Sequence, residues 1–596
     1  MTMRYLILLL MSASSWCVQL SLLNCSSSSP LAALIFHFSA SSDSNIVLNK
    51  TGECVTYNTS NTNLEMGTCV PGSSLQTFNL RGDGTIFNPA SGMCWDSQYY
   101  GNTSGSTMGL YTCDAQQLWD HFTFDSVSGN LIYGADSSLC VNGGAAPPPL
   151  PTPQQITWMD YEVSLMISYD IVTQLTEVPN PQHFCIQAGG DANFPVPPAT
   201  RFNPSNDTFT DSWIAAAKAA DAKYTLLVAS HCSGFFQWQS NVTLPDGSPY
   251  PYTVAQSYWK GGKGDVVDDY VKSSNAAGLG FGFYLTWNYN YLFNWGPSGF
   301  SKQPLQPGQI NVTEDQFRAL MIAQMAEVWS RYPNAITEVW FDGGERNDPM
   351  NELIKRLQPQ AIAADGTAPP NFARLVGSES GYAPYPVWST TNNAAQDGSG
   401  DPAGSLFCPA EADSPVAEKD AWFWKPAQVY RSLFELYSVY KNTVGANSLL
   451  ELGVLPDNTG AIPADQMAIL QGLGDYIRAC HSPEAAVAAT NGTGASLKLS
   501  FMSPQWVNRV IIQEDLTQGQ LVRAFNVYAI AGGGYRQEPV LVATGTAIGH
   551  KRILYFFSGP VLATGLTITA TDFYPSFTEA NWRNFAAYSP CELEKS

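Results

Sequence analysis

A carboxylate stands at the end of an apolar run in the middle of the chain. Residues 340–344 read Trp-Phe-Asp-Gly-Gly after Glu338-Val339, and this pattern predicts a buried strand that ends at Asp342, between aromatic rings and glycines. A carboxylate held there could attack an electrophilic carbon or stabilise a developing positive charge. Asp342 could equally cap the helix that follows, which is the more common use of such a residue in isolation.

The histidines and cysteines do not suggest metal ligation. The chain has six His and 12 Cys, no Cys-x-x-Cys pair, and only His183 and His231 between the proline-rich segment and residue 480. Zinc sites are built from closely spaced Cys and His ligands. We therefore expect no metal site and no organic cofactor.

The segments around Asp342 alternate between apolar strands and amphipathic helices. Residues 163–168, 224–230, 281–287 and 336–342 have strand character, and residues 213–222, 264–278 and 313–332 have helical periodicity. Successive βα units indicate a (β/α) barrel over residues 158–482. Active sites of such barrels lie at the carboxyl ends of the strands, so we expect His231, Asn288 and Asp342 to meet there.

Two further units flank the predicted barrel. Helical periodicity stops after residue 482, and short alternating strands with Gly-rich turns predict a β-sandwich over residues 483–596. Residues 144–157 are rich in proline and carry no charge up to residue 155, which predicts an extended spacer. Residues 45–143 form a separate unit on the other side of that spacer.

A repeat of about 40 residues organises this N-terminal unit. Cys54, Cys94 and Cys140 have similar flanking residues, and Gln76-Thr77-Phe78 and Gln117-Leu118-Trp119 lie between them. The pattern resembles the ricin-type β-trefoil lectins, whose repeats carry a Gln-x-Trp motif and an internal disulfide. The resemblance implies an all-β module with disulfide candidates Cys54, Cys69, Cys94 and Cys113. Sugar binding and a purely structural role both remain open for it.

The N-terminal residues predict entry into the secretory route. An arginine precedes a short apolar run and small residues, which is typical of a signal peptide, placed here at residues 1–22. Seven Asn-x-Ser/Thr sequons are glycosylation candidates: Asn49, Asn58, Asn102, Asn206, Asn241, Asn311 and Asn491. No later stretch is long and apolar enough for a membrane span, so we expect no membrane partner. A secreted or lysosome-like glycoprotein is predicted.

The amino-acid composition limits the kinds of molecule that we expect the protein to bind. The 29 Lys and Arg against 50 Asp and Glu give a net charge of −21, which disfavours nucleic acid. Aromatic residues make up 12% and charged residues only 13% of the chain. Flat aromatic faces beside neutral polar side chains suit carbohydrate. Composition leaves the oligomeric state open.

Several motifs of the predicted barrel resemble glycoside hydrolase family 29, the α-L-fucosidases. WFDG at residues 340–343 is similar to the family's nucleophile motif, and ARLVGSESG at 373–381 to its Arg-Trp-Val-Gly-Asn-Glu-x-Gly. CPAEADSPVAEKDAWFW at 408–424 is similar to a Pro-Ala-Glu-x-Asp segment that ends in Trp-Phe-Trp. LLELGVLPDNTGAIP at 449–463 is similar to Leu-Leu-Asn-x-x-Pro-x-x-x-Gly-x-Ile-Pro. The order of the motifs matches as well as their content.

This resemblance implies retaining hydrolysis of a terminal α-L-fucosyl residue from fucosylated glycans or glycoproteins, and the motif around Glu379 is similar to that of the branch that cleaves α-1,3 and α-1,4 linkages. Asp342 would be the nucleophile and Glu379, in GSESG, the acid/base. Such enzymes need two carboxyl groups about 5–5.5 Å apart, one of which keeps a raised pKa near aromatic surface. Glu411, beside Trp422 and Trp424 in its own motif, is the rival acid/base.

The resemblance also implies a sugar pocket with hydroxyl contacts and an aromatic wall. The candidate contacts are His231, Tyr169, Trp238, Trp287, Asn288, Trp388 and Trp424. The chain departs from the family here, because Ser-His-Cys-Ser-Gly-Phe at residues 230–235 stands where the family has Lys-His-His-Asp-Gly-Phe. Two alternatives therefore remain: a catalytically weakened carbohydrate-binding protein, and a hydrolase of a related sugar such as α-L-galactose.

Overall fold

The computed structural model divides into two compact units, residues 1–149 and 150–596, and each is described by itself. In the first unit the described residues are 18–19, 21–24, 36–37, 44–45, 47–48, 54–59, 62–67, 69–70, 73–81, 84–97, 108–113, 121–124, 131–134 and 139–142. From residue 148 the structure describes the chain to 594, except 178–193, 297–298, 301–303, 343–347, 365–370, 393–397, 419–420, 532–537 and 576. Within these ranges, no helix has the length and apolar character that crossing a bilayer requires.

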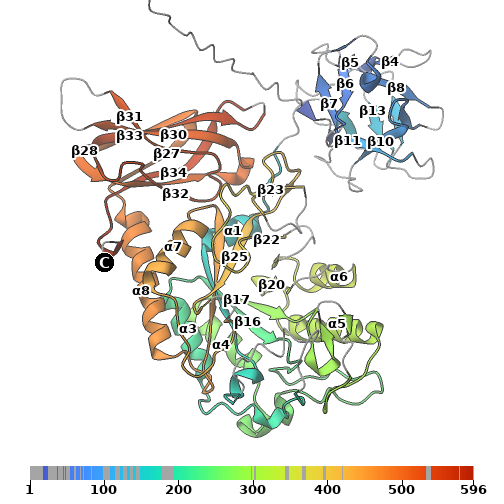
Figure 1. Ribbon diagram of the computed structural model, residues 1–596, viewed down its shortest axis with the longest axis vertical. Helices are drawn as coiled ribbons and strands as arrows, with labels where there is room; N and C mark the ends of the chain where they lie inside the picture. Colours follow the sequence, from blue (N-terminus) through green and yellow to red (C-terminus); the bar gives the residue numbers. More distant parts are fainter. Residues whose placement is uncertain are drawn as a thin grey trace, which may run out of the picture. The chain divides into compact units, whose positions relative to one another are not determined.

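The first unit consists of short antiparallel strands (Figure 1). Three sheets have the orders β1-β7-β6-β5-β3, β11-β10-β9-β8-β4 and β12-β13-β14-β2. The strand bounds are β1 Val18–Gln19, β2 Ser21–Asn24, β3 Phe36–His37, β4 Ser44–Asn45, β5 Val47–Leu48, β6 Cys54–Tyr57, β7 Leu64–Gly67, β8 Thr77–Leu80, β9 Ile86–Asn88, β10 Met93–Ser97, β11 Met108–Tyr111, β12 Phe122–Phe124, β13 Leu131–Tyr133 and β14 Leu139–Asn142.

Disulfides and one buried glutamine hold the repeats of this unit. Cys54 bonds to Cys69 and Cys94 bonds to Cys113, the four cysteines that the repeat pattern singled out. The buried Gln76 accepts from the Val70 amide at 2.7 Å and donates to the Thr56 hydroxyl at 2.9 Å. The glutamine of the repeat motif is therefore a local structural element, whereas the second copy at Gln117 lies outside the described residues.

The first unit begins earlier than the sequence suggested. β1 pairs with β7, and β2 pairs with β14 over four residues. Val18–Gln19 and Ser21–Asn24 therefore belong to the sheets, although they precede the predicted start of the module at residue 45 and overlap the predicted signal peptide, residues 1–22. The sequence at these positions is uncharged and compatible with strand alternation. Its composition therefore does not distinguish a signal peptide from an edge strand.

The spacer is also shorter than predicted, because helix α1 (Pro153–Tyr161) begins inside residues 144–157. Thr152 accepts from the Gln155 amide, and the Gln155 side chain accepts from the Thr152 amide, which completes a capping box with proline at the first helical position. Gln155 and Trp158 are buried against the barrel. The capping box thus starts a helix within a segment whose proline content predicts an extended chain.

Eight parallel strands form the barrel, in the spatial order β21-β20-β17-β16-β15-β26-β25-β22. Their bounds are β15 Val163–Ile167, β16 Tyr224–Ser230, β17 Gly280–Leu285, β20 Glu338–Trp340, β21 Ile362–Ala363, β22 Arg374–Leu375, β25 Ala410–Pro415 and β26 Ser448–Val454. The Ala363 amide donates to Asn371 O at 2.9 Å, and the Ala373 amide donates to Ala363 O at 3.2 Å. These bonds join the two ends of the sheet, so the predicted (β/α) barrel is confirmed.

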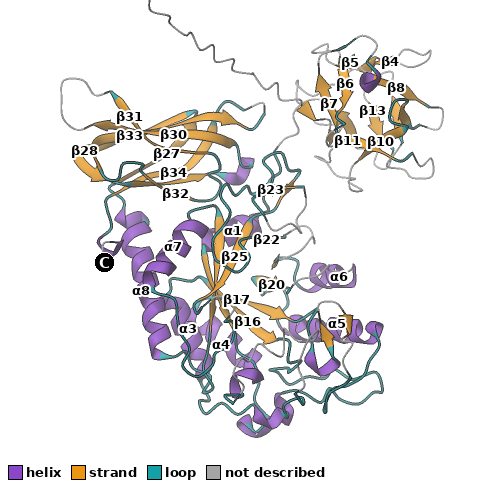
Figure 2. Cartoon of the chain, in the orientation of Figure 1, coloured by secondary structure: helices purple, strands orange, loops and turns teal. Residues whose placement is uncertain are grey.

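Amphipathic helices surround the barrel strands, as Figure 2 shows. They are α3 Phe209–Ala219, α4 Val266–Ala277, α5 Glu314–Arg331, α6 Asp348–Leu357, α7 Leu433–Thr443 and α8 Ala464–His481. In α5, the buried residues include Phe317, Met321 and Val328, which recur on one face and pack into the barrel core. This spacing explains why the helix was readable from the sequence.

The C-terminal residues form the predicted β-sandwich, with sheet orders β27-β34-β29-β32 and β28-β33-β30-β31. The bounds are β27 Ala488–Gly494, β28 Ser496–Val507, β29 Arg509–Glu514, β30 Val522–Ala531, β31 Pro539–Gly545, β32 Arg552–Tyr555, β33 Val561–Phe573 and β34 Ala580–Tyr588. Val510, Phe525 and Phe585 are among the buried side chains between the two sheets. A disulfide between Cys480 and Cys591 ties the last helix of the barrel to the end of the sandwich.

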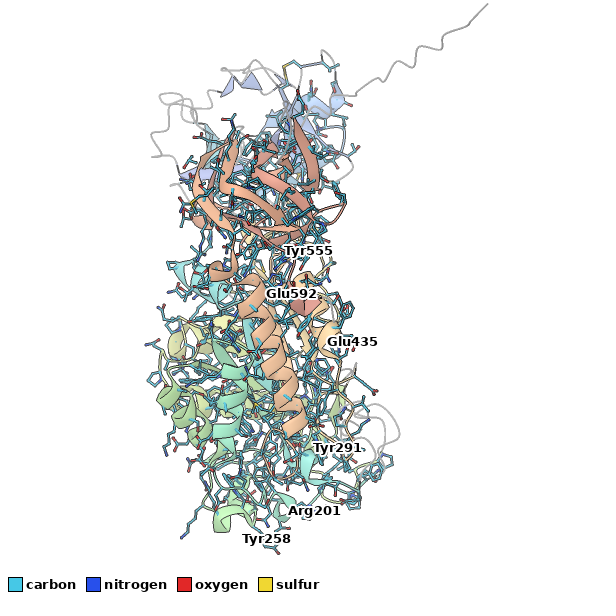
Figure 3. All side chains as sticks on the ribbon, turned by 90° about the vertical axis from the view of Figure 1, so that its left-hand side faces the viewer. Arg201, Tyr258, Tyr291, Glu435, Tyr555 and Glu592 are labelled. Atoms are coloured by element: carbon cyan, nitrogen blue, oxygen red, sulfur yellow. A yellow bond between two sulfur atoms is a disulfide. The ribbon has the colours of Figure 1, made fainter. Side chains whose placement is uncertain are left out.

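A charged contact joins the barrel to the sandwich. The Lys551 ammonium donates to both Glu162 carboxylate oxygens, at 2.8 and 2.7 Å, and its side chain is only 9% exposed. Beside it, Asp160 pairs with His550 and Arg583. Burial opposes ionisation of Asp160, but these two partners lower its pKa to about 2. Tyr555, labelled in Figure 3, donates to the Glu594 carboxylate, which also accepts from Tyr476 of α8 on the barrel side.

We predict that Lys551→Met destabilises the barrel and sandwich strongly. It leaves the Glu162 carboxylate buried without its cation, and breaking a buried pair in this way costs about 3–5 kcal/mol. Denaturant unfolding followed by intrinsic fluorescence would measure the change. Lys355→Met is the control, because the Lys355–Glu352 pair is exposed and contributes at most about 1 kcal/mol.

The same contact should vary with pH in a defined direction. Burial raises the pKa of Glu162, but the Lys551 charge outweighs it and leaves the pKa below its ordinary value. The stabilisation is therefore complete above the ordinary glutamate pKa of about 4.3 and is lost as pH falls through the lower, folded-state value. Equal effects of Lys551→Met at pH 7 and at pH 2 would contradict this assignment.

Candidate active site

The Asp342 carboxylate lies just beyond the end of β20 and is held by a tyrosine of the neighbouring strand. The Tyr284 hydroxyl donates to Asp342 Oδ2 at 2.7 Å. Tyr284 and Trp340 are register partners on β17 and β20, and their rings stack at 5.2 Å with an interplanar angle of 20°. A charge-assisted hydrogen bond and the aromatic stack therefore fix the orientation of Asp342 at the strand end.

His231 follows β16 and lies against the other side of Tyr284. The two rings stack at 5.0 Å, and the Phe423 ring meets His231 edge-on at 4.9 Å. Burial lowers the pKa of His231 to about 3. The imidazole is therefore neutral at ordinary pH and can exchange hydrogen bonds with a hydroxyl without carrying charge.

Glu379 lies on a tight turn after β22. Ser378 and Glu379 both have left-handed backbone conformations, with φ of 47° and 59°, which are unusual for residues with a side chain. Gly377, with φ of 87°, has no room for a Cβ, since that atom would lie 2.6 Å from Tyr382 O. Such strain persists where the surrounding structure imposes it, often at functional sites. The turn leaves Glu379 exposed and within 3.1 Å of the Trp422 indole N–H, which donates to it.

The two carboxylates meet at one barrel mouth. Burial, followed by the negative charges of Asp342 and Glu379, raises the pKa of Tyr289 to about 12, so both carboxylates act electrostatically on this one hydroxyl. A continuous set of contacts also joins them: Trp422 bonds Glu379, its neighbour Phe423 meets His231, His231 stacks on Tyr284, and Tyr284 bonds Asp342.

Glu411 occupies a different place. Its side chain is 0% exposed and lies inside the barrel, where its Oε1 accepts from the Trp340 indole at 3.1 Å. Burial and the neighbouring Glu451 charge raise the pKa of Glu411 well above its ordinary value. The Trp340 ring therefore contacts Glu411 through its N–H and Tyr284 through its face. Glu379, in contrast, is open to solvent at the mouth.

The remaining sequence-predicted contacts divide into two groups. Trp287 and Asn288 follow β17, and Trp287 is buried, with 2% of its surface exposed. Arg318 lies 4.6 Å from the centre of the Trp287 ring and donates to Asn288 Oδ1 at 3.2 Å. Trp424 is partly exposed, two residues after Trp422.

Three other predicted contacts are fully engaged elsewhere. Tyr169 packs among Phe202, Phe209 and Trp213, Trp238 stacks on Phe236 and bonds Glu327, and Trp388 packs under Arg523 of the sandwich. All three are buried. None of these contacts joins the three residues to the Asp342 or Glu379 carboxylate.

Sequence reasoning did not single out Tyr284, Tyr289 or Asp170. Asp170 is buried and accepts from the Ser233 hydroxyl at 2.9 Å, next to the segment that carries His231. Burial raises its pKa to about 7, against hydrogen bonds from Ser233 and the Val172 amide that lower it. The alternation of FGFYL is consistent with an inward-facing Tyr284, but only the pairing with the neighbouring strand shows that it lies beside Trp340.

Comparison with known proteins identifies the family to which the barrel is similar. The family description "Alpha-L-fucosidase" matches residues 197–481, and "Ricin-type beta-trefoil lectin domain" matches residues 19–157. The barrel is an α-L-fucosidase domain of glycoside hydrolase family 29. The chain is thus a glycoside hydrolase with an N-terminal trefoil, and the binding-only alternative is not supported.

Relatives of this fucosidase occur in plants and bacteria. The chain is 26% identical over 461 residues to α-L-fucosidase 1 of Arabidopsis thaliana, covering 69% of this chain and 82% of the relative. A candidate α-L-fucosidase of Bacteroides thetaiotaomicron has a crystal structure with a TM-score of 0.64 at 29% identity, covering 74% of this chain and all of the other. A family 29 fucosidase of Ruminococcus gnavus, solved with fucose, has a TM-score of 0.61 at 19% identity, covers 75% of this chain and 97% of the other, and shows the fold alone.

We predict that Tyr284→Phe lowers kcat/KM of this fucosidase about 10–100-fold. The substitution keeps both ring stacks but removes a hydrogen bond to a charged group, which contributes about 1.5–3 kcal/mol. Initial rates with an aryl α-L-fucoside would measure it. Tyr258→Phe is the control, since that side chain is exposed at the end of the molecule marked in Figure 3 and should leave kcat/KM unchanged. A Tyr284→Phe enzyme with more than half the original kcat/KM would refute the role of this bond.

Proposed function

We propose that this fucosidase removes terminal α-L-fucose from glycans or glycoproteins with retention of configuration, with Asp342 as nucleophile and Glu379 as acid/base. The carrying observation is the continuous set of contacts at the barrel mouth, which runs from Glu379 through Trp422, Phe423, His231 and Tyr284 to Asp342. Retaining hydrolysis requires two carboxyl groups on either side of one glycosidic bond. The exposure of Glu379 and the complete burial of Glu411 favour Glu379 as the group that reaches the leaving oxygen.

In the first step, Asp342 attacks the anomeric carbon while Glu379 gives its proton to the departing glycosidic oxygen. A covalent fucosyl ester of Asp342 forms, and the aglycone leaves. In the second step, ionised Glu379 takes a proton from water, which attacks the same carbon and releases Asp342 and fucose. The Tyr284 hydrogen bond steadies Asp342 in its ionised state before attack and again after release.

The neutral groups at the mouth suit a neutral sugar. His231 and Asn288 can each donate to or accept from a hydroxyl, and the partly exposed Trp424 offers apolar surface to the methyl group of a 6-deoxy sugar. Arg318 holds Asn288 and covers one face of Trp287, so it orients these groups. The motif around Glu379 resembles the family branch that cleaves α-1,3 and α-1,4 linkages, and we extend that preference to this chain.

We further propose that the protein works in an oxidising compartment, outside the cell or in a lysosome-like organelle. Disulfides occur in both units, at Cys54–Cys69, Cys94–Cys113 and Cys480–Cys591, and such bonds persist in secreted proteins. Asn241, Asn311 and Asn491 are exposed and Asn58 and Asn206 partly exposed, whereas Asn49 and Asn102 lie outside the described residues. Glycosidase digestion and mass spectrometry of the secreted protein would test these sites.

Asp342→Gly should lower turnover of an aryl α-L-fucoside by several orders of magnitude, because the covalent intermediate can no longer form. Added azide should restore part of the rate by attacking the anomeric carbon in the space left by the side chain. Retention of configuration by the unmodified enzyme, followed by NMR of the first-formed fucose anomer, completes the test. More than a tenth of the original activity in Asp342→Gly would exclude it as nucleophile.

Glu379→Ala should affect substrates with poor leaving groups far more than activated aryl fucosides, since only the former require protonation. The measurement is kcat/KM over a series of leaving-group pKa values for Glu379→Ala and Glu411→Gln. The second variant keeps an acceptor for the Trp340 indole, so it should lower rates evenly across the series. If the leaving-group dependence appears in Glu411→Gln alone, the two glutamates must exchange roles.

A further inference from the structure

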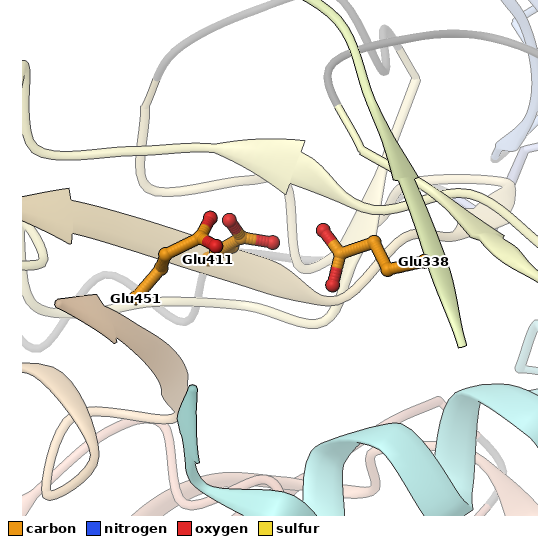
Figure 4. A group of neighbouring side chains, drawn as sticks. All are labelled: Glu338, Glu411 and Glu451. Atoms are coloured by element: carbon orange, nitrogen blue, oxygen red, sulfur yellow. The ribbon is translucent and has the colours of Figure 1, made fainter. Parts of the chain in front are cut away.

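Three buried glutamates face one another inside the barrel. Glu338 on β20, Glu411 on β25 and Glu451 on β26 each offer a carboxylate oxygen, and these oxygens lie within 4.8 Å of one another (Figure 4). All three side chains are 0% exposed. Among the ion pairs that the described part of the chain contains, none includes any of them. Their charges need compensation from another source.

Among the described residues, hydrogen-bond donors reach one carboxylate oxygen of Glu338 and one of Glu411. Trp158 donates its indole N–H to Glu338 Oε2 at 2.7 Å, and the Tyr224 hydroxyl donates to the same atom. The Trp340 indole donates to Glu411 Oε1. No described donor, a protonated neighbouring carboxyl aside, reaches Glu338 Oε1 or Glu411 Oε2. Ligating carboxylates have this arrangement, with one oxygen on the metal and the other bonded by outer groups.

Glu451 is the third carboxylate of the group, beside Glu338 and Glu411. When the motif Leu-Leu-Asn-x-x-Pro is aligned on Pro456, Glu451 stands at a leucine position. Neither of its oxygens has a described donor apart from a protonated neighbour. A carboxyl group in place of a core leucine is destabilising unless something compensates it, and a proton or a cation can do so.

A separate residue points into the same space. Ser164 on β15 is fully buried, and its hydroxyl has no described partner. It is the register partner of Tyr224 on one side and of Glu451 on the other. Register partners of a parallel sheet present their side chains on the same face, so the Ser164 oxygen lies on the inner face beside Glu451.

We propose that Glu338, Glu411, Glu451 and the Ser164 hydroxyl form an internal site for one hard divalent cation, with calcium as the best fit. All four donors are oxygens, which calcium, magnesium and manganese prefer. Calcium–oxygen distances of about 2.3–2.6 Å allow ligand atoms on opposite sides to be as far apart as these are. The spacing of Cys and His residues, from which we expect no metal site, carries no information about a site built from oxygen ligands.

The site would support catalysis without touching the substrate. Glu411 bonds Trp340, and Trp340 stacks on Tyr284, which holds Asp342. A cation that fixes Glu411 would thereby fix the floor under the nucleophile. The inference rests on the proposed function in one respect, because Glu411 can hold a cation only if Glu379 is the acid/base.

The test compares the full-length enzyme with Glu451→Gln and Glu451→Leu. Proteins purified without chelator are analysed for metal by mass spectrometry, and thermal midpoints are measured with EDTA and with added Ca²⁺, Mg²⁺ or Mn²⁺. The wild type should hold about one equivalent of divalent metal and lose thermal stability after chelation in mild urea, with recovery on adding Ca²⁺. Both variants should hold at least tenfold less metal and not respond. Asp475→Asn, which removes an exposed carboxylate, is the matched control.

Shared protons are the competing explanation for the group of three. A wild-type enzyme without stoichiometric metal, whose midpoint ignores all three cations at pH 8, would overturn the proposal. If the Glu451 variants do not fold, Ser164→Ala and Mn²⁺ electron paramagnetic resonance of the wild type decide the question. A bound Mn²⁺ signal that weakens in Ser164→Ala supports the site, and its absence from the wild type refutes it.

Discussion

The hydrogen bond from Tyr284 to Asp342 is the contact around which the site is arranged. One face of the tyrosine ring lies against Trp340 and the other against His231, so three strand ends are fixed by one side chain. The phenol is buried and its pKa lies far above its ordinary value, first through burial and then through the Asp342 charge. It therefore acts as a permanent donor, and it biases Asp342 towards the ionised form that a nucleophile needs.

The carboxyl groups of Asp342, Glu379 and Glu411 lie at different depths in the barrel, which the sequence alone does not show. Asp342 and Glu379 follow the ends of β20 and β22, where solvent and substrate can reach them. Glu411 lies on the inner face of β25 beneath Trp340, where ionisation is opposed by burial and by neighbouring acids. A proton donor must exchange with solvent during each turnover, so the exposed position of Glu379 supports its proposed role as the acid/base.

The two halves of the second unit support each other through charge as well as apolar packing. Asp160 and Glu162 lie at the end of α1, on the barrel side, and they pair with cations of the sandwich. The Cys480–Cys591 bond closes the same junction covalently. The sandwich thus anchors the first helix and the last helix of the barrel, which steadies the strands that carry the site from outside.

The sequence by itself determined the barrel, the sandwich and the repeats of the trefoil, because periodicity and turn residues are local signals. It also placed Asp342 at a strand end and marked GSESG as a turn after a strand. It could not tell that Tyr169 and Trp238 are core residues, since alternation gives the face of a strand and not what packs on it. Only the closed barrel decided that the carboxylates of Glu338, Glu411 and Glu451 lie within 4.8 Å of one another, and that Glu379 rather than Glu411 is exposed at the mouth. Strand register and tilt set the height of each side chain in a barrel, and they arise from pairing between distant segments.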